Sequence, residues 1–409
     1  MRISNIVLGL SVSFLLVNVC FANTKEENFH SFIDRVLNNS STIKVKKLEL
    51  ESEGYKAKQT DYFYLPKVSA TGKIKNGEDA INSNLTATSL IYDSALSHRF
   101  SEKELKLKIS EILLNKEKND LYSTVTNNLI GIHFLNELKS KTNNLNRKAQ
   151  DNFNLINRRY NSGMAKSSDL EQATLLMQRI DIEQKNIENE IEQYKSNIEL
   201  ISGLEFPANG VNLPDILIKK LKQTIIKNDG VLNNSDYKIL DMQANLLKEN
   251  SQQQDPFFNV NLIAEERYAN QNRSQSESYV GVEIKVNIFD IDKKLNELSQ
   301  LKLYEAAKGK ADYKHSEVTA KIKNLKTIAT ANEMELASLQ SQRNTMLAMI
   351  KSQEREYEIS QSSFYEMVNT LFDMLTVERK ISESMIANMK NKMEYIQLIG
   401  KLEEIENPS

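Results

Sequence analysis

The sequence contains one unit twice, and this duplication constrains the fold more than any other feature. The pentapeptide Val36-Leu37-Asn38-Asn39-Ser40 recurs unchanged as Val231-Leu232-Asn233-Asn234-Ser235. Three further landmark pairs follow in the same order: Leu65-Pro66 with Asp255-Pro256, Ile91-Tyr92-Asp93 with Ile288-Phe289-Asp290, and Tyr160 and Asp169 with Phe364 and Asp373. Matched landmarks in one order indicate a tandem duplication, so we expect two similar halves.

Each half holds a stretch that can form long helices. Residues 94–201 contain no proline and only Gly131 and Gly163, and residues 291–405 contain no proline and only Gly309 and Gly400. Because proline breaks helices, the absence of proline allows long continuous helices in both stretches. Between matched landmarks the second stretch is longer by about one heptad, which extends a helix without turning its apolar stripe much.

Apolar residues in these stretches repeat with coiled-coil spacing. In the first half the series steps by threes and fours and is broken only at Gln184: Leu170, Ala173, Met177, Ile180, Ile187, Ile191, Tyr194, Ile198 and Ile201. The second series begins at Met374, Val377 and Ile381, passes through Ser384, Asn388 and Asn391, and ends at Tyr395, Leu398 and Leu402. We therefore expect helical hairpins with a coiled-coil seam. We also expect the middle of the last helix to face water.

Short segments ahead of each helical stretch alternate as strands do. In the second half two runs do so: Val280, Val282, Ile284, Val286 and Ile288 alternate with Gly281, Glu283, Lys285 and Asn287, and Phe258, Val260, Leu262 and Ala264 alternate with Asn259, Asn261 and Ile263. Fainter runs in the first half are Val68, Ala70, Gly72 and Ile74, then Leu85, Ala87, Ser89 and Ile91. This pattern fits a transmembrane barrel wall whose lumen receives Glu283, Lys285 and Asn287. A soluble sheet packed on helices is the alternative.

The N-terminus has the pattern of a secretory signal peptide. Arg2 precedes an apolar run from Ile6 to Val19, and Cys20-Phe21-Ala22 offers a cleavage site after Ala22. Acylation of Cys20 is the alternative, although the residues before it are not the small ones that a lipoprotein needs. Cys20 is the only cysteine, so the mature chain has no disulfide framework, thiolate zinc site or cysteine nucleophile.

Several function classes are disfavoured by the composition. The formal net charge is −2, which makes nucleic acid an unexpected partner. The four histidines are scattered, and no phosphate loop or nucleophile motif is present, so we expect no enzyme, catalytic residue, metal site or cofactor. After Ala22 no run reaches the roughly 18 apolar residues of a membrane helix. Any membrane span is therefore expected to consist of strands.

Barrel closure then sets the expected assembly. Four strands per chain cannot close a barrel, and an open edge within lipid leaves backbone groups unpaired. Two chains would give a filled barrel, whereas three chains give a twelve-stranded trimeric barrel with room for a lumen. Continuous helices in each long stretch would extend this barrel by roughly 100 Å at about 1.5 Å per residue.

The sequence resembles the TolC-like outer membrane efflux family over nearly the whole mature chain. The residues that carry the resemblance are Leu65-Pro66-Lys67-Val68-Ser69, Leu90-Ile91-Tyr92-Asp93, Arg159-Tyr160-Asn161-Ser162-Gly163 with Asp169-Leu170, Leu200-Ile201-Ser202-Gly203, Ile288-Phe289-Asp290 and Thr370-Leu371-Phe372-Asp373-Met374-Leu375. The resemblance implies a homotrimer in outer-membrane lipid, with a coiled-coil α-helical tunnel across the periplasm. It also implies docking to a periplasmic adaptor and an inner-membrane transporter, ABC-type or proton-driven, for export of protein or small molecules.

The resemblance also assigns roles at the hairpin tips. Gly163 matches the first-tip glycine, while Met367 stands where the family often has glycine, and both are implied in adaptor docking. Ser168 and Asp169 keep one side of the polar links between hairpins, but Phe364 and Asn369 replace the tyrosine and arginine of the other side. Phe364 lacks a hydroxyl donor and Asn369 cannot form a bidentate ion pair. The closed state is therefore expected to be held differently.

The periplasmic aperture is expected at the second tip. Asp373 matches one position of the family's acidic ring, and the second ring position falls on Thr376. A surface aspartate favoured by the helix dipole is the other interpretation of Asp373. Threefold symmetry would gather three Asp373 carboxylates around one axis, which would favour cations at the entrance.

The expected organisation is mainly α with a transmembrane β part. Residues 1–22 form the signal peptide, 23–206 the first repeat, 207–230 the inter-repeat segment, 231–405 the second repeat and 406–409 a short tail. Each repeat comprises a helix, a strand pair and a long helical hairpin. A periplasmic adaptor and a structural coiled-coil protein are the alternatives. Two tandem hairpins, each with its own strand pair, argue against the adaptor. A structural coiled-coil protein would leave the inward-polar, outward-apolar strands unexplained.

Overall fold

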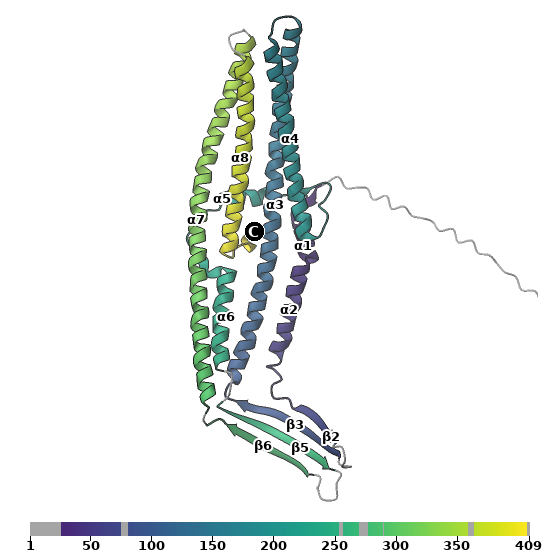
Figure 1. Ribbon diagram of the computed structural model, residues 1–409, viewed down its shortest axis with the longest axis vertical. Coiled ribbons are helices and arrows are strands. Elements are labelled where there is room, and N and C mark those ends of the chain that lie inside the picture. Colours follow the sequence, from purple (N-terminus) through teal and green to yellow (C-terminus); the bar gives the residue numbers. More distant parts are fainter. Residues whose placement is uncertain are drawn as a thin grey trace, which may run out of the picture.

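The computed structural model is elongated, with long helices running side by side and one sheet at their end (Figure 1). It describes residues 26–74, 81–252, 257–269, 277–288, 290–358 and 364–406. The expected signal peptide, the landmark Asp255-Pro256 and Phe289 lie outside the described residues.

Two unbroken helices run from the sheet to the hairpin tips. Helix α3 (Leu96–Asn161) has 66 residues and α7 (Ile291–Glu358) has 68. Each spans roughly 100 Å at about 1.5 Å per residue. Helices α4 (Ser167–Ser202) and α8 (Phe364–Leu398) return from the tips and end at mid-height. The two expected hairpins are thus confirmed as continuous helices.

In the half of the molecule nearer the sheet, α3 and α7 pack against different helices. Helix α2 (Ser41–Lys58) packs on α3, and α6 (Ser235–Ser251) packs on α7 and also on α3. The molecule therefore repeats one arrangement twice, in which a long helix changes its partner at mid-height (Figure 1).

Short elements fill the middle of the molecule. Strand β1 (Glu27–Asn28) and helix α1 (Phe29–Asn39) open the first repeat. The inter-repeat segment holds β4 (Val211–Asn212) and α5 (Asp215–Gln223), followed by a 3₁₀ turn at Val231–Asn233. β1 pairs with β4 in parallel. A final turn, α9 (Glu403–Glu406), ends the described chain.

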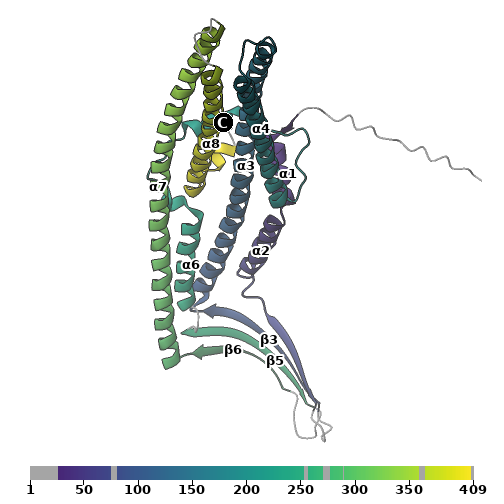
Figure 2. The same cartoon turned by 45° about the horizontal axis from the view of Figure 1, so that its top comes forward.

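The strand pairs of the two repeats join into one antiparallel sheet in the order β2-β3-β5-β6. Its strands are β2 (Lys67–Ile74), β3 (Ile81–Asp93), β5 (Phe258–Ala269) and β6 (Glu277–Val286). They curve and run at a steep angle to the helices (Figure 2). β6 ends at Val286, so Asn287 and Ile288 lie beyond the expected strand, although the Asn287 N–H still donates to the Phe257 carbonyl at 2.9 Å.

A β-bulge interrupts the alternation expected in β3, so the expected position of Ile91 is wrong. The register shifts between Leu90 and Tyr92, so that Tyr92 rather than Ile91 lies opposite Val260. A bulge inserts one residue and moves the following side chains to the other face. Tyr92 consequently stacks on Phe258, with ring centroids 5.2 Å apart.

The coiled-coil seam of α4 is confirmed for most of its length. Ala173, Ile180, Ile187, Ile191 and Ile198 are buried. The polar interruption is matched across the seam, because Gln184 donates to the Asn143 side chain of α3 at 2.7 Å. At the end of the series Ile201 is 40% exposed, so the seam ends before the helix does.

The middle of α8 is buried, contrary to the expectation that it faces water. Ser384 and Asn388 are 8% and 4% exposed. Helix α8 packs against α3, α4, α5 and α7, which covers these two polar positions of its series, while Asn391 is only half-buried. Ser382, also in this segment, donates its hydroxyl to the Phe134 carbonyl of α3 at 3.2 Å.

Candidate functional site

The sheet has one apolar face and one polar face. Paired residues of neighbouring antiparallel strands point to the same side, so the pairing of Val260 with Ile284 and of Leu262 with Val282 gathers apolar side chains on one face. Ile284 and Val282 are 65% and 59% exposed. A broad apolar surface therefore stands uncovered in the single chain, as the barrel hypothesis requires of a lipid-facing wall.

The opposite face carries the expected polar residues. Glu283 pairs with Asn261 and Lys285 with Asn259, and the Asn261 amide donates to the Glu283 carboxylate at 3.2 Å. Thr86 and Thr88 of β3 continue this face. The alternation expected for Glu283 and Lys285 is thus present, while Asn287 follows the end of the strand.

Aromatic rings stand near both ends of the apolar face. The Tyr92–Phe258 stack lies at the end nearer the helices, and Tyr268, 56% exposed, lies toward the other end of β5. At about 3.3 Å per residue, a strand tilted by about 40° would cover roughly 25 Å of depth between Phe258 and Tyr268. That depth matches the apolar band of outer-membrane barrels, about 25 Å tall between aromatic girdles.

Both edges of the sheet are open and are flanked by apolar helix faces. β2 and β6 each pair on one side only within the described sheet. Near β2, helix α2 exposes Val45, Leu48 and Tyr55, and beyond β6 the start of α7 exposes Ile291, Leu295 and Leu298. An open edge beside exposed apolar residues is a surface suited to another chain.

The exposed stripe of α8 brings together three of the expected aperture residues. Asn369, Asp373 and Thr376 are all exposed and follow one another at helical spacing. The same stripe continues through Lys380 and Glu383 toward mid-height. Asp373 and Thr376 therefore lie on one accessible helix face, as a channel lining would require.

The first tip is a tight turn between α3 and α4. Gly163 has φ +76°, a left-handed conformation that glycine adopts without strain. Ser168 and Asp169 are exposed in the first turn of α4. Within the described residues, neither side chain bonds to the second hairpin; residues 359–363 lie outside them.

Phe364 and Met367 point into the hairpin core instead of to its surface. They are 3% and 1% exposed and pack with Ile156, Ile180 and Leu371. The Phe364 ring lies 5.8 Å from that of Tyr357. Any role of Met367 in docking would therefore act through packing of the tip.

Cation–π contacts tie the hairpins together near the tips. The Arg159 guanidinium of α3 lies 4.5 Å from the ring centroid of Tyr357 in α7, and that of Arg179 in α4 lies 4.4 Å from Phe372 in α8. Each contact crosses from the first hairpin to the second. Such contacts contribute about 0.5–2 kcal/mol.

Two adjacent residues of α8 make a second set of links farther from the tips. Arg379 binds Glu183 and Glu190 of α4, at 3.0 Å from Glu183, and also Glu383 on its own helix. Glu378, 2% exposed, binds Lys141 of α3 at 3.1 Å and Arg343 of α7. We name Glu378 and Arg379 the inter-hairpin clamp. Burial raises the pKa of Glu183, with Arg379 acting against this shift.

The sequence does not predict this clamp, because charged residues on a helix usually indicate a solvated face. Glu378 and Arg379 directly follow Val377, an apolar position of the seam. That adjacency was the available signal, because a helix surrounded by other helices buries more than one stripe.

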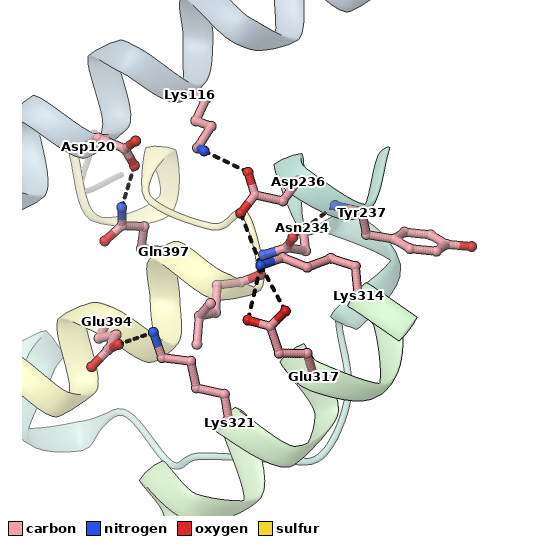
Figure 3. A network of polar contacts seen from close by, with 11 residues as sticks. Lys116, Asp120, Asn234, Asp236, Tyr237, Lys314, Glu317, Lys321, Glu394 and Gln397 are labelled. Atoms are coloured by element: carbon pink, nitrogen blue, oxygen red, sulfur yellow. Dashed lines mark hydrogen bonds and ion pairs between the residues drawn. The ribbon is translucent and has the colours of Figure 1, made fainter. Parts of the chain in front are cut away.

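A polar network joins four helices at mid-height (Figure 3). Asp236 of α6 binds Lys116 of α3 at 2.6 Å and Lys314 of α7 at 3.6 Å. Gln397 of α8 donates to Asp120 of α3 at 2.6 Å. Burial alone would raise the pKa of Asp236, but the hydrogen bond and charge of Lys116, with Lys314, lower it. This network stabilises the region where α3 and α7 exchange one packing partner for another.

Two other kinds of site are absent from the described residues. None of the helices in the described residues is long and apolar enough to cross a membrane. The same residues contain no group of three or more histidine, cysteine, aspartate or glutamate side chains arranged to hold a metal ion.

Comparison with solved structures identifies the fold. The structures with this fold include CusC (TM-score 0.74, 12% identity, covering 90% of this chain and 91% of that chain). Two others are VceC, an outer membrane protein of Vibrio cholerae (0.73, 12%, 90% and 95%), and CmeC, an outer membrane channel of Campylobacter jejuni (0.68, 12%, 91% and 85%). No protein-family model matches the sequence, and no curated protein sequence does. The expected resemblance to TolC-like channels is thus confirmed in the fold.

Proposed function

We propose that this chain is the subunit of a homotrimeric outer-membrane channel that exports protein or small molecules through a helical tunnel. The observation that carries the proposal is the two-faced sheet with open edges, joined to unbroken helices roughly 100 Å long. The fold shared with outer-membrane channels supports it.

Edge pairing supports the proposed stoichiometry. The β6 edge of one chain would pair with the β2 edge of the next, and the exposed apolar faces of α7 and α2 would meet beside this junction. Twelve strands would then enclose a lumen lined by Glu283 and Lys285, with lipid outside. Such a head-to-tail contact closes into a ring when the rotation per subunit is right.

The aperture is proposed at the hairpin tips. Asp373 and Thr376 would face the threefold axis from the exposed stripe of α8, and Ser168, Asp169 and Asn369 would lie beside them. An adaptor and an inner-membrane transporter would dock at the tips, where Gly163 forms its turn.

Crosslinking of the purified mature chain in detergent, followed by planar-bilayer recording, tests the proposal. We expect a heat-labile trimer that conducts ions. A stable monomer or dimer without conductance would refute the barrel and, with it, the channel.

A further inference from the structure

A cavity of about 880 Å³ lies where the sheet meets the helices. Its walls are the end of α2, the connection from α2 to β2, the start of α3 and the polar faces of β2, β3 and β5. The volume falls in the range of small-molecule sites, about 300–1,000 Å³. The elements that form these walls lie at the opposite end of the long helices from the hairpin tips, where the aperture is proposed (Figure 1).

Positive charge predominates in this cavity. Lys58, Lys67, Arg99 and Lys103 line it, with Asp93 as the only carboxylate among the lining residues. Asp93 is 3% exposed, and its carboxylate already binds Arg99 at 2.8 Å and accepts the Ala95 N–H at 2.8 Å. The three lysine charges are therefore not offset by any carboxylate lining the cavity.

Two of the lysines, Lys58 and Lys103, contact neutral partners. Lys103 donates to the Gln59 side-chain oxygen at 3.2 Å, and the Lys58 ammonium lies 5.7 Å from the centroid of the Tyr55 ring. Burial lowers the pKa of Lys103, and the charges of Arg99, Lys106 and Lys67 lower it further, with Glu102 opposing them. A bound anion would offset this repulsion.

Aromatic rings supply the apolar part of the wall. Phe63 and Phe100 meet edge to face with centroids 5.6 Å apart, and Tyr55 and Tyr62 line the same cavity. Rings beside ammonium groups suit a ligand that carries an apolar ring and a negative charge. An inorganic anion would leave the rings unused, and a neutral apolar compound would leave the charges unused.

We propose that this cavity binds small organic anions with an aromatic body, such as aryl carboxylates and sulfonates. The inference rests on the proposed function in one respect. The polar sheet face is proposed to line the lumen, which would place the cavity on the export path and make such anions a cargo class or a block of the channel.

Binding of 8-anilinonaphthalene-1-sulfonate to the purified mature chain in non-ionic detergent tests the site by fluorescence titration. K67Q/K103Q should weaken the dissociation constant about tenfold, because two charges that face the sulfonate are removed. The matched control is K302Q/K323Q, two exposed lysines of α7, which should leave binding within about twofold. The neutral analogue N-phenyl-1-naphthylamine should bind all three proteins alike.

Equal sulfonate affinities in the two double variants would overturn the site. A loss of affinity for the neutral analogue in K67Q/K103Q would also overturn it, because the cavity would then have collapsed or the binding would not depend on charge. Bilayer conductance of the same samples separates the two proposals. A conducting trimer with equal affinities keeps the channel and removes the site, whereas charge-dependent binding in a non-conducting monomer keeps the site and removes the channel.

Discussion

Asn39 and Asn234 are the same residue of the repeated pentapeptide and make the same hydrogen bond in their own repeats. The Asn39 amide donates to the Ser202 carbonyl at the end of α4 at 2.9 Å, and the Asn234 amide donates to the Leu398 carbonyl at the end of α8 at 3.0 Å. Each asparagine thus satisfies a carbonyl that a helix end leaves unpaired. In each repeat the pentapeptide therefore lies where the second helix of the hairpin ends beside the segment that begins the repeat.

Replacing these asparagines should destabilise the two repeats unequally. Asn234 also caps α6 by accepting the Tyr237 N–H at 3.0 Å, whereas in the first repeat Ser40 caps α2. N39A should cost about 1 kcal/mol and N234A about 2–3 kcal/mol, because N234A removes two bonds. Thermal unfolding measures both, with exposed Asn38→Ala as the control. Equal losses in the two variants would contradict the double role of Asn234.

Charging the apolar sheet face should prevent assembly. I284R would place three arginines per trimer against lipid, at about 2–4 kcal/mol each near the midplane. K285L changes the neighbouring position, which is proposed to face the lumen, and should still assemble. Heat-labile trimer on gels is the measurement. Normal assembly of I284R together with failure of K285L would show that the faces are reversed.

The aperture assignment predicts block by multivalent cations. Wild-type channels should be blocked by a trivalent cation added from the periplasmic side, and D373N should reduce this block because three charges leave the entrance. T376D should strengthen the block by restoring a second acidic ring. Single-channel recording measures both variants. An unchanged block in D373N would place the gate elsewhere.

The inter-hairpin clamp should make stability depend on pH once its arginine is removed. Burial already raises the pKa of Glu183, and R379Q removes the cation that opposes this shift while Glu190 and Glu383 stay nearby, so the folded-state pKa of Glu183 rises further above the unfolded one. A raised carboxyl pKa gives stability that is full below the unfolded pKa and is lost as pH rises through the folded pKa. R379Q should therefore lose about 1–3 kcal/mol near pH 7 and recover much of it near pH 5. Thermal unfolding at both pH values measures this.

The exposed Lys380→Gln, next to the clamp, serves as the control for R379Q and should show no such recovery. The same loss for R379Q at both pH values would mean that Arg379 acts by packing and not by its charge.

Local periodicity was sufficient to predict the helices, the seam of α4 and the two faces of β6. Each depends on residues a few positions apart, which the sequence displays directly. The bulge at Ile91 could not be predicted this way, because it is defined by the partner strand from the other repeat. The burial of Ser384 and Asn388 likewise depends on four neighbouring helices that periodicity does not reveal.

Sequence periodicity likewise predicted some residues of the candidate site and not others. The stripe with Asn369, Asp373 and Thr376 shares one helix face, as spacing indicated, whereas Met367 lies on the buried side of the same helix. The ion pairs of Arg379 with α4 and of Glu378 with α3 join residues far apart in sequence. Only the packing of the two hairpins brings these charges together.

The change of partners along α3 and α7 has a mechanical consequence. Both helices are continuous from sheet to tip, whereas their partners α2, α4, α6 and α8 begin or end at mid-height, where Lys116, Asp236 and Lys314 meet. A helix resists bending and twisting over this length far more than side-chain contacts resist sliding. Torsion applied to the tips would therefore be transmitted along α3 and α7. The resulting sliding between helices would concentrate at mid-height, where their partner helices begin or end. In the proposed trimer, the distance from tip to sheet would then stay nearly constant while the opening between the tips changed in width.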